Sequence, residues 1–223
     1  NKYNIDDVYT DMNAIRRFEE LDNLHSLYVD QWDWERRLTP EQRNTRTLKT
    51  TVKKIYKAFI KTYLKLIKKF PELENSFAKE VTFITTKELE KMYPNLSRKE
   101  RENAICKKYG TVFLMQIGNK LKDGESHDSR AADYDDWKFN GDILLWYEPL
   151  QIAFELSSMG SRVNKESLVK QLKAKKEEYK LEMPYHQSII NDELPLSIGG
   201  GIGQSRLCMF LLKKVHIGEV QSS

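Results

Sequence analysis

Residues 24–35 read LHSLYVDQWDWE, and the alternation of their side chains predicts a β-strand. Its two faces differ in chemistry, with aromatic rings on one and an amide and two carboxylates on the other: Tyr28, Trp32 and Trp34 opposite Gln31, Asp33 and Glu35. Two tryptophans on one side favour a strand packed against a core. Carboxylates on the second face of a packed strand indicate a polar site, because buried charge needs a partner or a ligand. A surface strand with one solvated face shows the same alternation, so this pattern alone leaves both interpretations open.

Composition limits the class of protein. The chain has 223 residues, 39% hydrophobic and 31% charged, which suits one large domain or a domain with a helical insertion. The net charge of +4 is too small to indicate a nucleic-acid partner. Cys106 and Cys208 are spaced neither as a metal site nor as a disulfide framework, so we expect a reducing, cytoplasmic environment. We expect no membrane partner, since no apolar run approaches ~20 residues and no signal peptide is visible.

A long hairpin and a long helix are predicted in the first third of the chain. Val8–Arg16 and Ser26–Glu35 read as antiparallel strands joined by a polar loop, with Arg16 and Glu19 at the turn end. Apolar residues then recur every three to four positions over Leu48–Phe70, which predicts an amphipathic helix. Its other face is rich in lysine. An RNA-binding face and a solvated helix face would both show this pattern, and we favour the solvated face.

The remaining elements surround an acidic loop. We predict strands over residues 81–85, 111–117, 141–147 and 153–158, and helices over 86–92, 97–109, 164–179 and 181–191. The helix beginning at 97 has a capping box formed by Ser97 and Glu100. The loop combines one arginine with four carboxylates: Asp128, Arg130, Asp133, Asp135 and Asp136.

The segment GGGIGQSR, residues 199–206, predicts a glycine turn between a strand and a helix. It has neither the Gly-Lys-Ser/Thr of a P-loop nor the spacing of a dinucleotide fingerprint. A tight turn that caps a helix would account for one or two glycines, but hardly for four in five positions. We therefore favour a flat floor that a ligand can approach, with Arg206 placed to stack on a purine or to clamp a phosphate.

Acidic residues on two adjacent predicted strands form a second candidate site. Asp142 and Glu155 have the character of a pair that holds Mg²⁺ on a nucleotide with the help of phosphate oxygens. Arg162 follows Glu155 by seven residues, beyond the small residues Ser157, Ser158 and Gly160, and an arginine there can hold a carboxylate bidentately. An ordinary salt bridge between Glu155 and Arg162 is the alternative. The neighbouring glycine floor favours a binding site.

These features together resemble motifs two and three of the class II aminoacyl-tRNA synthetases, through Arg16 and Glu19, Glu155 and Arg162, and Arg206. From about Met12 to Gln221 the chain resembles one family more narrowly, the bacterial-type aspartate–ammonia ligases, or ammonia-dependent asparagine synthetases. The motifs that carry this resemblance occur in order along the chain: YVDQWDWE (28–35), DYDDW (133–137), NGDIL (140–144), AFELSSMG (153–160), GGGIGQSR (199–206) and HIG (216–218).

The resemblance implies an α+β fold, with a class II synthetase-like antiparallel sheet flanked by helices, in a single catalytic domain over residues 1–223. The family has a further N-terminal segment that contributes strands, dimer contacts and a lysine of the aspartate pocket. Since this chain starts at Asn1, without Met and inside what reads as a strand, we expect the domain to lack that segment. The stretch between Trp137 and Gly141 is also shorter than in the family.

The resemblance further implies the ATP-dependent amidation of L-aspartate with ammonia, which gives L-asparagine, AMP and pyrophosphate through a β-aspartyl-adenylate. ATP and Mg²⁺ are the implied cofactors, and the implied assembly is a homodimer. Arg16 is then expected at the α-phosphate and the attacking carboxylate, and Glu19 at the adenine amino group. Arg206 would cover the adenine or the γ-phosphate, while Asp142 and Glu155 would hold Mg²⁺.

The aspartate pocket follows in the same way from the resemblance. Arg162 and Gln31 are expected to hold aspartate, and Asp33 or Asp135 its α-ammonium group. The expected hydrogen-bond partners of the ribose or the substrate are Ser26 and Ser158. Ammonia must react as NH₃, so a carboxylate has to bind ammonium and accept its proton. Three candidates for this base stay open: Asp33, Asp135 and Asp142.

Two alternatives belong to other functional classes. An aspartyl- or asparaginyl-tRNA synthetase core would share the motifs, but it normally carries an anticodon-binding barrel for which this length leaves no room. A non-catalytic paralogue that acts as a binding module would be expected to lose Arg16, Glu155 or Arg206, and all three are present. No N-terminal nucleophilic cysteine of a glutaminase is visible, which favours free ammonia as the nitrogen source.

Overall fold

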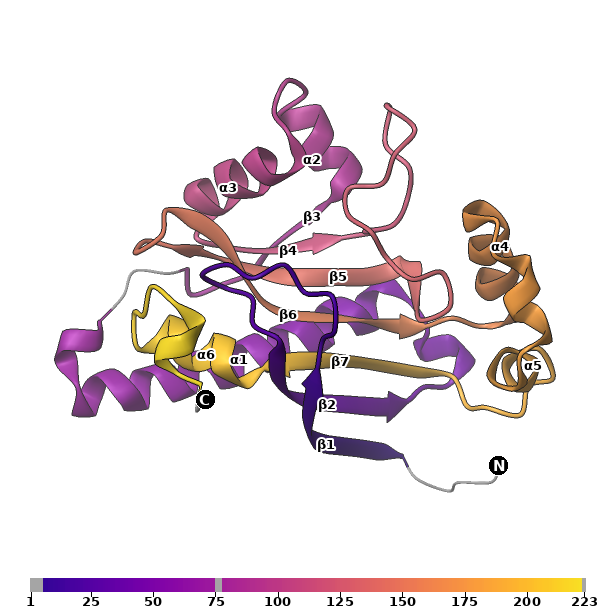
Figure 1. The fold of residues 1–223 in the computed structure, drawn as a ribbon, viewed down its shortest axis with the longest axis horizontal. Helices are drawn as coiled ribbons and strands as arrows, with labels where there is room; N and C mark the ends of the chain where they lie inside the picture. Colours follow the sequence, from indigo (N-terminus) through magenta and orange to yellow (C-terminus); the bar gives the residue numbers. More distant parts are fainter. Residues whose placement is uncertain (1–5, 75–77, 222–223) are drawn as a thin grey trace.

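A single seven-stranded sheet organises the chain in the computed structural model, which describes residues 6–74 and 78–221. The strand order is β1-β2-β7-β6-β5-β4-β3 (Figure 1), and among these neighbours only β3 and β4 run parallel. The strand bounds are β1 Asp7–Ile15, β2 Tyr28–Arg37, β3 Thr82–Thr85, β4 Thr111–Met115, β5 Asp135–Tyr147, β6 Ile152–Arg162 and β7 Ser197–Gly203. The expected strand around Asn1 falls outside the described residues.

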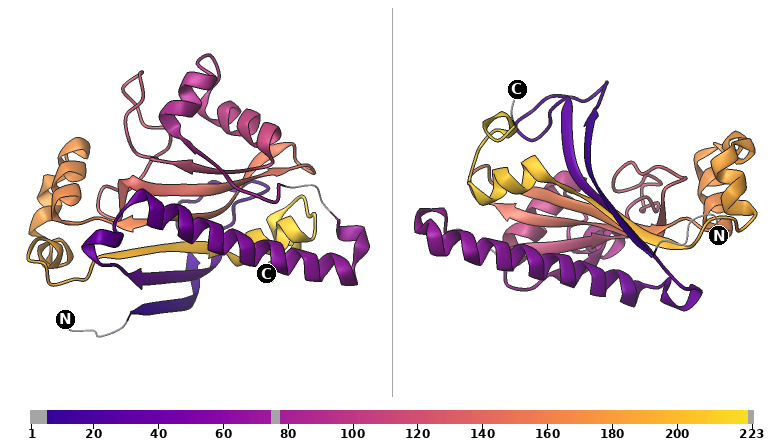
Figure 2. Two further views of the ribbon diagram at one scale, coloured as in Figure 1. Left: turned by 180° about the vertical axis from the view of Figure 1, so that it is seen from behind. Right: turned by 90° about the horizontal axis from the view of Figure 1, so that it is seen from below.

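Helices cover the two faces of the sheet unequally. Figure 2 shows α1 crossing one face from end to end, whereas α2 and α3 lie on the other face beside β3 and β4, and α4 and α5 sit at one end. The helix bounds are α1 Thr45–Lys69, α2 Thr86–Met92, α3 Arg98–Tyr109, α4 Lys165–Lys175, α5 Pro184–Ile190 and α6 Gln204–Leu211. Four 3-10 helices complete the order: η1 Pro40–Gln42, η2 Pro71–Leu73, η3 Glu178–Glu182 and η4 Ile217–Glu219. The prediction of an α+β fold is confirmed.

The core divides along the alternation of the strands. Odd-numbered residues of β5, such as Ile143 and Leu145, pack with Val52 of α1, while Leu144 points to the opposite face and packs with Ile105 of α3. Because α2 and α3 reach only β3 to β6, no helix of the described residues covers the same face of β2 and β7. That uncovered half of the sheet carries the polar side chains of the candidate site.

Tertiary pairing changes three predicted elements. Residues 199–203 are not a turn: they form most of β7, which lies between β2 and β6. Asp135 and Asp136 belong to the start of β5 rather than to a loop. The predicted helix over 164–179 ends at Lys175, because Lys176 adopts the left-handed conformation and a 3-10 helix follows.

The prediction that both tryptophans of β2 pack against the core is wrong for Trp32. Only Trp34 of the two β2 tryptophans packs on the core, while Trp32 is 38% exposed. Over the described ranges, no helix combines the length and apolar character needed to cross a membrane.

Candidate active site

A polar cavity of about 420 Å³ opens on the uncovered half of the sheet, a volume that suits a nucleotide-sized ligand. Strands β2, β7 and β6 form its floor, and its walls are the loop after β1 and the loop before β5. Every candidate residue except Asp142 lines it: Arg16, Glu19, Ser26, Gln31, Asp33, Asp135, Glu155, Ser158, Arg162 and Arg206. The structure thus brings together residues that are up to 190 positions apart in the chain.

The glycines of β7 leave the room that the carboxylates of β2 occupy. In the antiparallel register, Glu35 pairs with Gly199 and Asp33 with Gly201. A Cβ on Gly201 would stand 2.6 Å from Asp33 Oδ1, and one on Gly199 would collide with the Glu35 carboxylate. Strand β7 therefore needs glycines, which have no side chain, at the positions of this face where the side chains of β2 lie across it.

A β-bulge aligns the polar residues of β6. The register between β5 and β6 shifts between Ile143 and Leu144, so Ile143 pairs with Ser157 whereas Leu144 pairs with Glu155. An uninterrupted strand would place residues 155 and 158 on opposite faces. With the bulge, Glu155 and Ser158 both line the cavity.

Arg162 is the centre of the buried end of the cavity. Its Nε donates to Glu35 Oε1 at 2.5 Å, its Nη2 also contacts that oxygen, and its Nη1 donates to Asp135 Oδ1. The guanidinium lies over the Tyr134 ring at 3.9 Å from the centroid. Three of its five N–H groups are thereby used, which leaves two for a substrate carboxylate.

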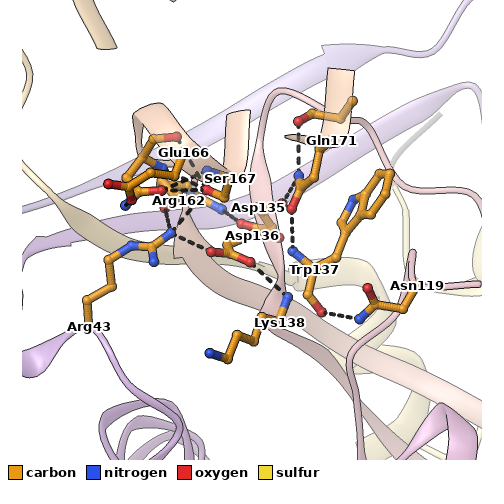
Figure 3. Close-up of polar contacts among 12 residues, drawn as sticks. Arg43, Asn119, Asp135, Asp136, Trp137, Lys138, Arg162, Glu166, Ser167 and Gln171 are labelled. Atoms are coloured by element: carbon orange, nitrogen blue, oxygen red, sulfur yellow. Dashed lines mark hydrogen bonds and ion pairs between the residues drawn. The ribbon is translucent and has the colours of Figure 1, made fainter. Parts of the chain in front are cut away.

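The start of β5, which carries Asp135, is fixed by a hydrogen-bond network (Figure 3). Gln171 of α4 accepts from Trp137 N at 2.8 Å and donates to the carbonyls of Ala132 and Asp135 at 3.0 Å each. On the other side, Arg43 donates to Asp136 Oδ2 at 2.6 Å and to the Arg162 carbonyl at 3.2 Å. The side chains of Arg43 and Asp136 are almost fully buried. The contacts of Gln171 and Arg43 thus fix the backbone positions at which Asp135 meets Arg162.

Asp33 presents a carboxylate to the cavity without a hydrogen-bond donor among the described residues. Burial raises the pKa of the Asp33 carboxyl, Arg162 opposes this rise, and the charge of Glu35 adds to it. Burial likewise raises the pKa of Asp135, against the lowering effect of Arg162. Of the three candidate bases, Asp33 is the one that combines access to the cavity with an unengaged carboxylate.

Asp142 lies apart from the cavity lining. It is 5% exposed, and its Oδ2 accepts a hydrogen bond from Arg130, a residue of the cavity wall. Burial raises the pKa of the Asp142 carboxyl, the charge of Glu155 raises it further, and Arg130 lowers it. Two carboxylates that repel each other in this way are stabilised by an added cation.

The main evidence that Asp142 and Glu155 could hold Mg²⁺ is the Oδ1 atom of Asp142. Asp142 Oδ1 is buried and has no hydrogen-bond partner in the described part of the chain. Glu155 has no ion pair there and faces the cavity. The described residues hold no cluster of three or more metal-binding side chains. Mg²⁺ on a nucleotide commonly uses one or two carboxylates and takes its other ligands from phosphates and water, so the pair fits it.

The opposite end of the cavity is formed by the hairpin loop and by α6. Arg16 pairs with Glu19 at 2.8 Å in the loop. Arg206, in the first turn of α6, donates to the Glu155 carbonyl at 3.1 Å and lies 5.8 Å from the centroid of the Phe154 ring. Asp30 fixes the start of α6 by accepting from Ser205 N at 3.0 Å and from Ser205 Oγ at 2.6 Å.

A family model described as aspartate–ammonia ligase matches residues 1–223. The chain belongs to the aspartate–ammonia ligase family. It is 58% identical over 216 residues to the aspartate–ammonia ligase of Lactiplantibacillus plantarum and 57% identical to that of Pediococcus pentosaceus. Each alignment covers 97% of this chain but 67% and 64% of those relatives. The chain thus spans about two thirds of the length of the curated aspartate–ammonia ligases that it matches.

Two solved structures with a similar fold are aminoacyl-tRNA synthetases. An aspartyl-tRNA synthetase from Entamoeba histolytica has a TM-score of 0.69 at 18% identity and covers 97% of this chain and 47% of its own. An asparaginyl-tRNA synthetase from Pyrococcus horikoshii, complexed with asparaginyl-adenylate, has a TM-score of 0.66 at 13% identity, over 96% and 51% of the two chains. These similarities confirm the prediction of a class II synthetase-like fold.

Sequence reasoning on this aspartate–ammonia ligase family member missed several residues of the site. The sequence places Glu35 on the polar face of its strand and Arg130 in the acidic loop, and it indicates no role for either. Asp30 and Tyr134 lie within the motifs YVDQWDWE and DYDDW, again without an indicated role. The alternation of β2 contained a signal for Glu35, whereas only the three-dimensional contacts reveal Arg130 and Tyr134.

Proposed function

We propose that this protein joins ammonia to L-aspartate at the expense of ATP, giving L-asparagine, AMP and pyrophosphate. Membership of the aspartate–ammonia ligase family is the observation that carries the proposal. The lining of the cavity supports the proposal. It contains Arg162, which is paired with Asp135, and Asp33, whose carboxylate has no hydrogen-bond donor among the described residues. Arg16 and Arg206 line the other end of the cavity.

In the first step, an oxygen of the aspartate β-carboxylate attacks the α-phosphorus of ATP. The bond from that phosphorus to the bridging oxygen breaks, pyrophosphate leaves and a β-aspartyl-adenylate forms. Two anions must approach each other, so positive charge is needed on both. Arg16 is proposed to cover the α-phosphate and the attacking carboxylate, with Glu19 at the adenine amino group and Arg206 at the adenine or the terminal phosphate.

Arg162 is proposed to hold the substrate carboxylate through its two remaining N–H groups, with Gln31 beside it. Glu35 and Asp135 orient this guanidinium from behind, which is a positioning role for both carboxylates. Ser26 and Ser158 both line the cavity and are proposed as hydrogen-bond partners of ribose and substrate.

In the second step, nitrogen of NH₃ attacks the acyl carbon, the carbon–oxygen bond to AMP breaks, and one proton must leave the nitrogen. That proton passes to water. Asp33 is proposed as the group that binds ammonium beforehand and takes the separate proton whose loss gives NH₃, since Arg162 engages Asp135 and Arg130 engages Asp142. Asp142 and Glu155 would hold Mg²⁺, which supplies positive charge to the phosphates when bound.

Product analysis tests the reaction. With aspartate, ATP, Mg²⁺ and ammonium, chromatography is expected to show AMP, pyrophosphate and asparagine in equal amounts. The appearance of ADP would exclude attack at the α-phosphate. Asp33→Asn is expected to abolish asparagine formation while aspartate-dependent exchange of pyrophosphate into ATP continues, because that exchange needs only the first step.

The fold of the tRNA synthetases supports a second candidate, transfer of aspartate to RNA. The same assay separates the two functions when ammonium is replaced by transfer RNA. Aminoacylated RNA in that arm, without asparagine in the ammonium arm, would favour the second candidate.

We further propose a cytoplasmic homodimer. Cys106 and Cys208 are both free thiols, as in a reducing compartment. The edge strand β1 and the loop after it expose large apolar side chains that a second subunit would cover: Val8, Tyr9, Ile15, Phe18 and Leu21.

A further inference from the structure

The charges of the cavity lining do not by themselves suit a triphosphate. Five carboxylates line it against four arginines. Three of these arginines already pair with a carboxylate: Arg16 with Glu19, Arg130 with Asp142, and Arg162 with Glu35 and Asp135. A ligand that carries several negative charges therefore needs positive charge from beyond the lining.

Helix α3 packs against β6 near Glu155, a residue of the cavity lining. In this contact, Asn103 Oδ1 accepts a hydrogen bond from Ala153 N at 2.8 Å, two residues before Glu155. In the first turn of α3, Lys99 extends an ammonium group whose side chain is 66% exposed. It was not identified as a site residue from the sequence.

Lys99 is held by a buried acid–imidazole pair. Its Nζ lies 2.8 Å from Glu102 Oε2, and Glu102 Oε1 lies 3.0 Å from His127 Nε2. The Glu102 side chain is 14% exposed and that of His127 1%, so both are withdrawn from solvent. His127 belongs to the loop that three residues later provides Arg130 to the cavity wall.

Lys99 lies one helical turn before Asn103, the α3 residue that accepts the hydrogen bond from the β6 backbone at Ala153. The pKa of Lys99 is raised overall: partial burial lowers it, Glu102 outweighs this effect, the Glu155 carboxylate raises it further and the Arg206 guanidinium lowers it. Arg206 and Glu155 are themselves joined by the hydrogen bond from Arg206 to the Glu155 carbonyl. The charges of Glu155 and Arg206 thus act on the Lys99 ammonium, although Lys99 itself is not part of the cavity lining.

We propose that Lys99 binds the terminal phosphates of ATP, and hence the departing pyrophosphate, and that Glu102 and His127 are positioning residues that hold it there. This assignment rests on the proposed function, since it names a further binding residue at the same site. An ordinary surface pair spaced three residues apart on a helix would not require a buried partner such as His127, nor a helix that contacts β6 two residues before Glu155.

Equilibrium binding tests the proposal without any need for turnover. Titration calorimetry with Mg²⁺ and AMP, ATP or pyrophosphate compares the wild type with Lys99→Met, and Lys91→Met serves as the control on exposed α2. Lys99→Met is expected to weaken ATP and pyrophosphate about fivefold to tenfold and to leave AMP unchanged. Lys99→Arg is expected to restore most of the loss, and Lys91→Met to resemble the wild type.

Equal weakening of AMP and ATP in Lys99→Met, or no weakening of ATP, would overturn the assignment. If the wild type binds neither ATP nor pyrophosphate, the proposed function fails as well, so the two failures are distinguishable. Glu102→Gln keeps the shape but removes the charge that holds Lys99. It is expected to raise KM for ATP severalfold with a smaller change in kcat, whereas a variant that merely loosens the fold would lower the amount of active enzyme and leave KM unchanged.

Discussion

Gly199 and Gly201 shape the site through the space they leave to Glu35 and Asp33. We expect Gly201→Ala to push the Asp33 carboxylate aside and to lower kcat/KM for aspartate by about 100-fold, since small misplacements of reacting groups are costly. Steady-state kinetics and thermal unfolding measure the two effects separately. Gly124→Ala is the control: its Cβ meets no neighbour and only its positive φ is strained, so it should lose about 1 kcal/mol of stability with unchanged KM. Unaltered kinetics in Gly201→Ala would contradict the placement of Asp33.

Arg162 compensates two carboxylates as well as facing the cavity. We expect Arg162→Met to prevent aspartate use and to destabilise the fold by about 3–5 kcal/mol, because Asp135 is left buried and unpaired. Adding Asp135→Asn should return much of the stability while aspartate binding stays lost, and ATP binding should remain in both variants. Chemical denaturation and calorimetry give these quantities. If aspartate binding returned with stability, Arg162 would have a structural role only.

At the scale of elements, α4 fixes the first residues of β5 through Gln171. Gln171→Met keeps the length of the side chain but leaves three buried backbone groups without partners, which we expect to cost about 3 kcal/mol or more. KM for aspartate should rise more than KM for ATP, because Asp135 moves with β5. Gln187→Met, which loses one exposed hydrogen bond, is the matched control. An equal rise of both KM values would show that α4 acts on the whole cavity.

The segment formed by η3 and α5 is joined to the loop before β5 by Asp133, which contacts His186 at 3.1 Å and Lys180 at 3.3 Å. Burial raises the pKa of Asp133, but its contacts with His186 and Lys180 outweigh burial and lower the pKa below 3.8. Because the pKa of Asp133 is lower in the folded state than in the unfolded state, these contacts stabilise the fold fully at pH values above the pKa of the unfolded state. Their stabilising effect is lost as the pH falls through the pKa of the folded state.

Hydrogen exchange in residues 178–190 should therefore accelerate as the pH is lowered from about 5 to about 3, after correction for the intrinsic rate. Asp133→Asn should show faster exchange already at neutral pH and little further change on acidification. A wild type whose corrected exchange does not depend on pH would contradict the coupling through Asp133.

At the scale of the whole molecule, the exposed apolar residues of β1 and its loop predict association. Tyr9 is 76% and Ile15 71% exposed, on an edge strand with unpaired backbone groups. Sedimentation equilibrium is expected to give a species of twice the protomer mass, and the double variant Tyr9→Glu with Ile15→Lys a monomer. Tyr179→Glu changes an aromatic residue of η3 that is 65% exposed, and it should leave the dimer intact. A monomeric wild type would contradict the homodimer.

Local patterns in the sequence predicted most of the secondary structure. The alternation of 28–35 placed Gln31, Asp33 and Glu35 on one face because a strand has a period of two, whatever it pairs with. The capping box of Ser97 and Glu100 marked the start of α3 for a similarly local reason. The motif resemblance added the fold and the residues that meet at the cavity.

Tertiary structure decided what those patterns leave open. Residues 199–203 read as a turn because glycines disfavour strands, yet β2 and β6 supply hydrogen bonds on both sides and the carboxylates of β2 need the empty face. The bulge that brings Glu155 and Ser158 to one face depends on pairing with β5, and Asp142 leaves the cavity lining because Arg130 engages it from another loop. Lys99 owes its position to Glu102, and Glu102 to His127, 25 residues away. Periodicity fixes the face on which a side chain lies, whereas the partner that it meets there depends on distant segments that only folding brings together.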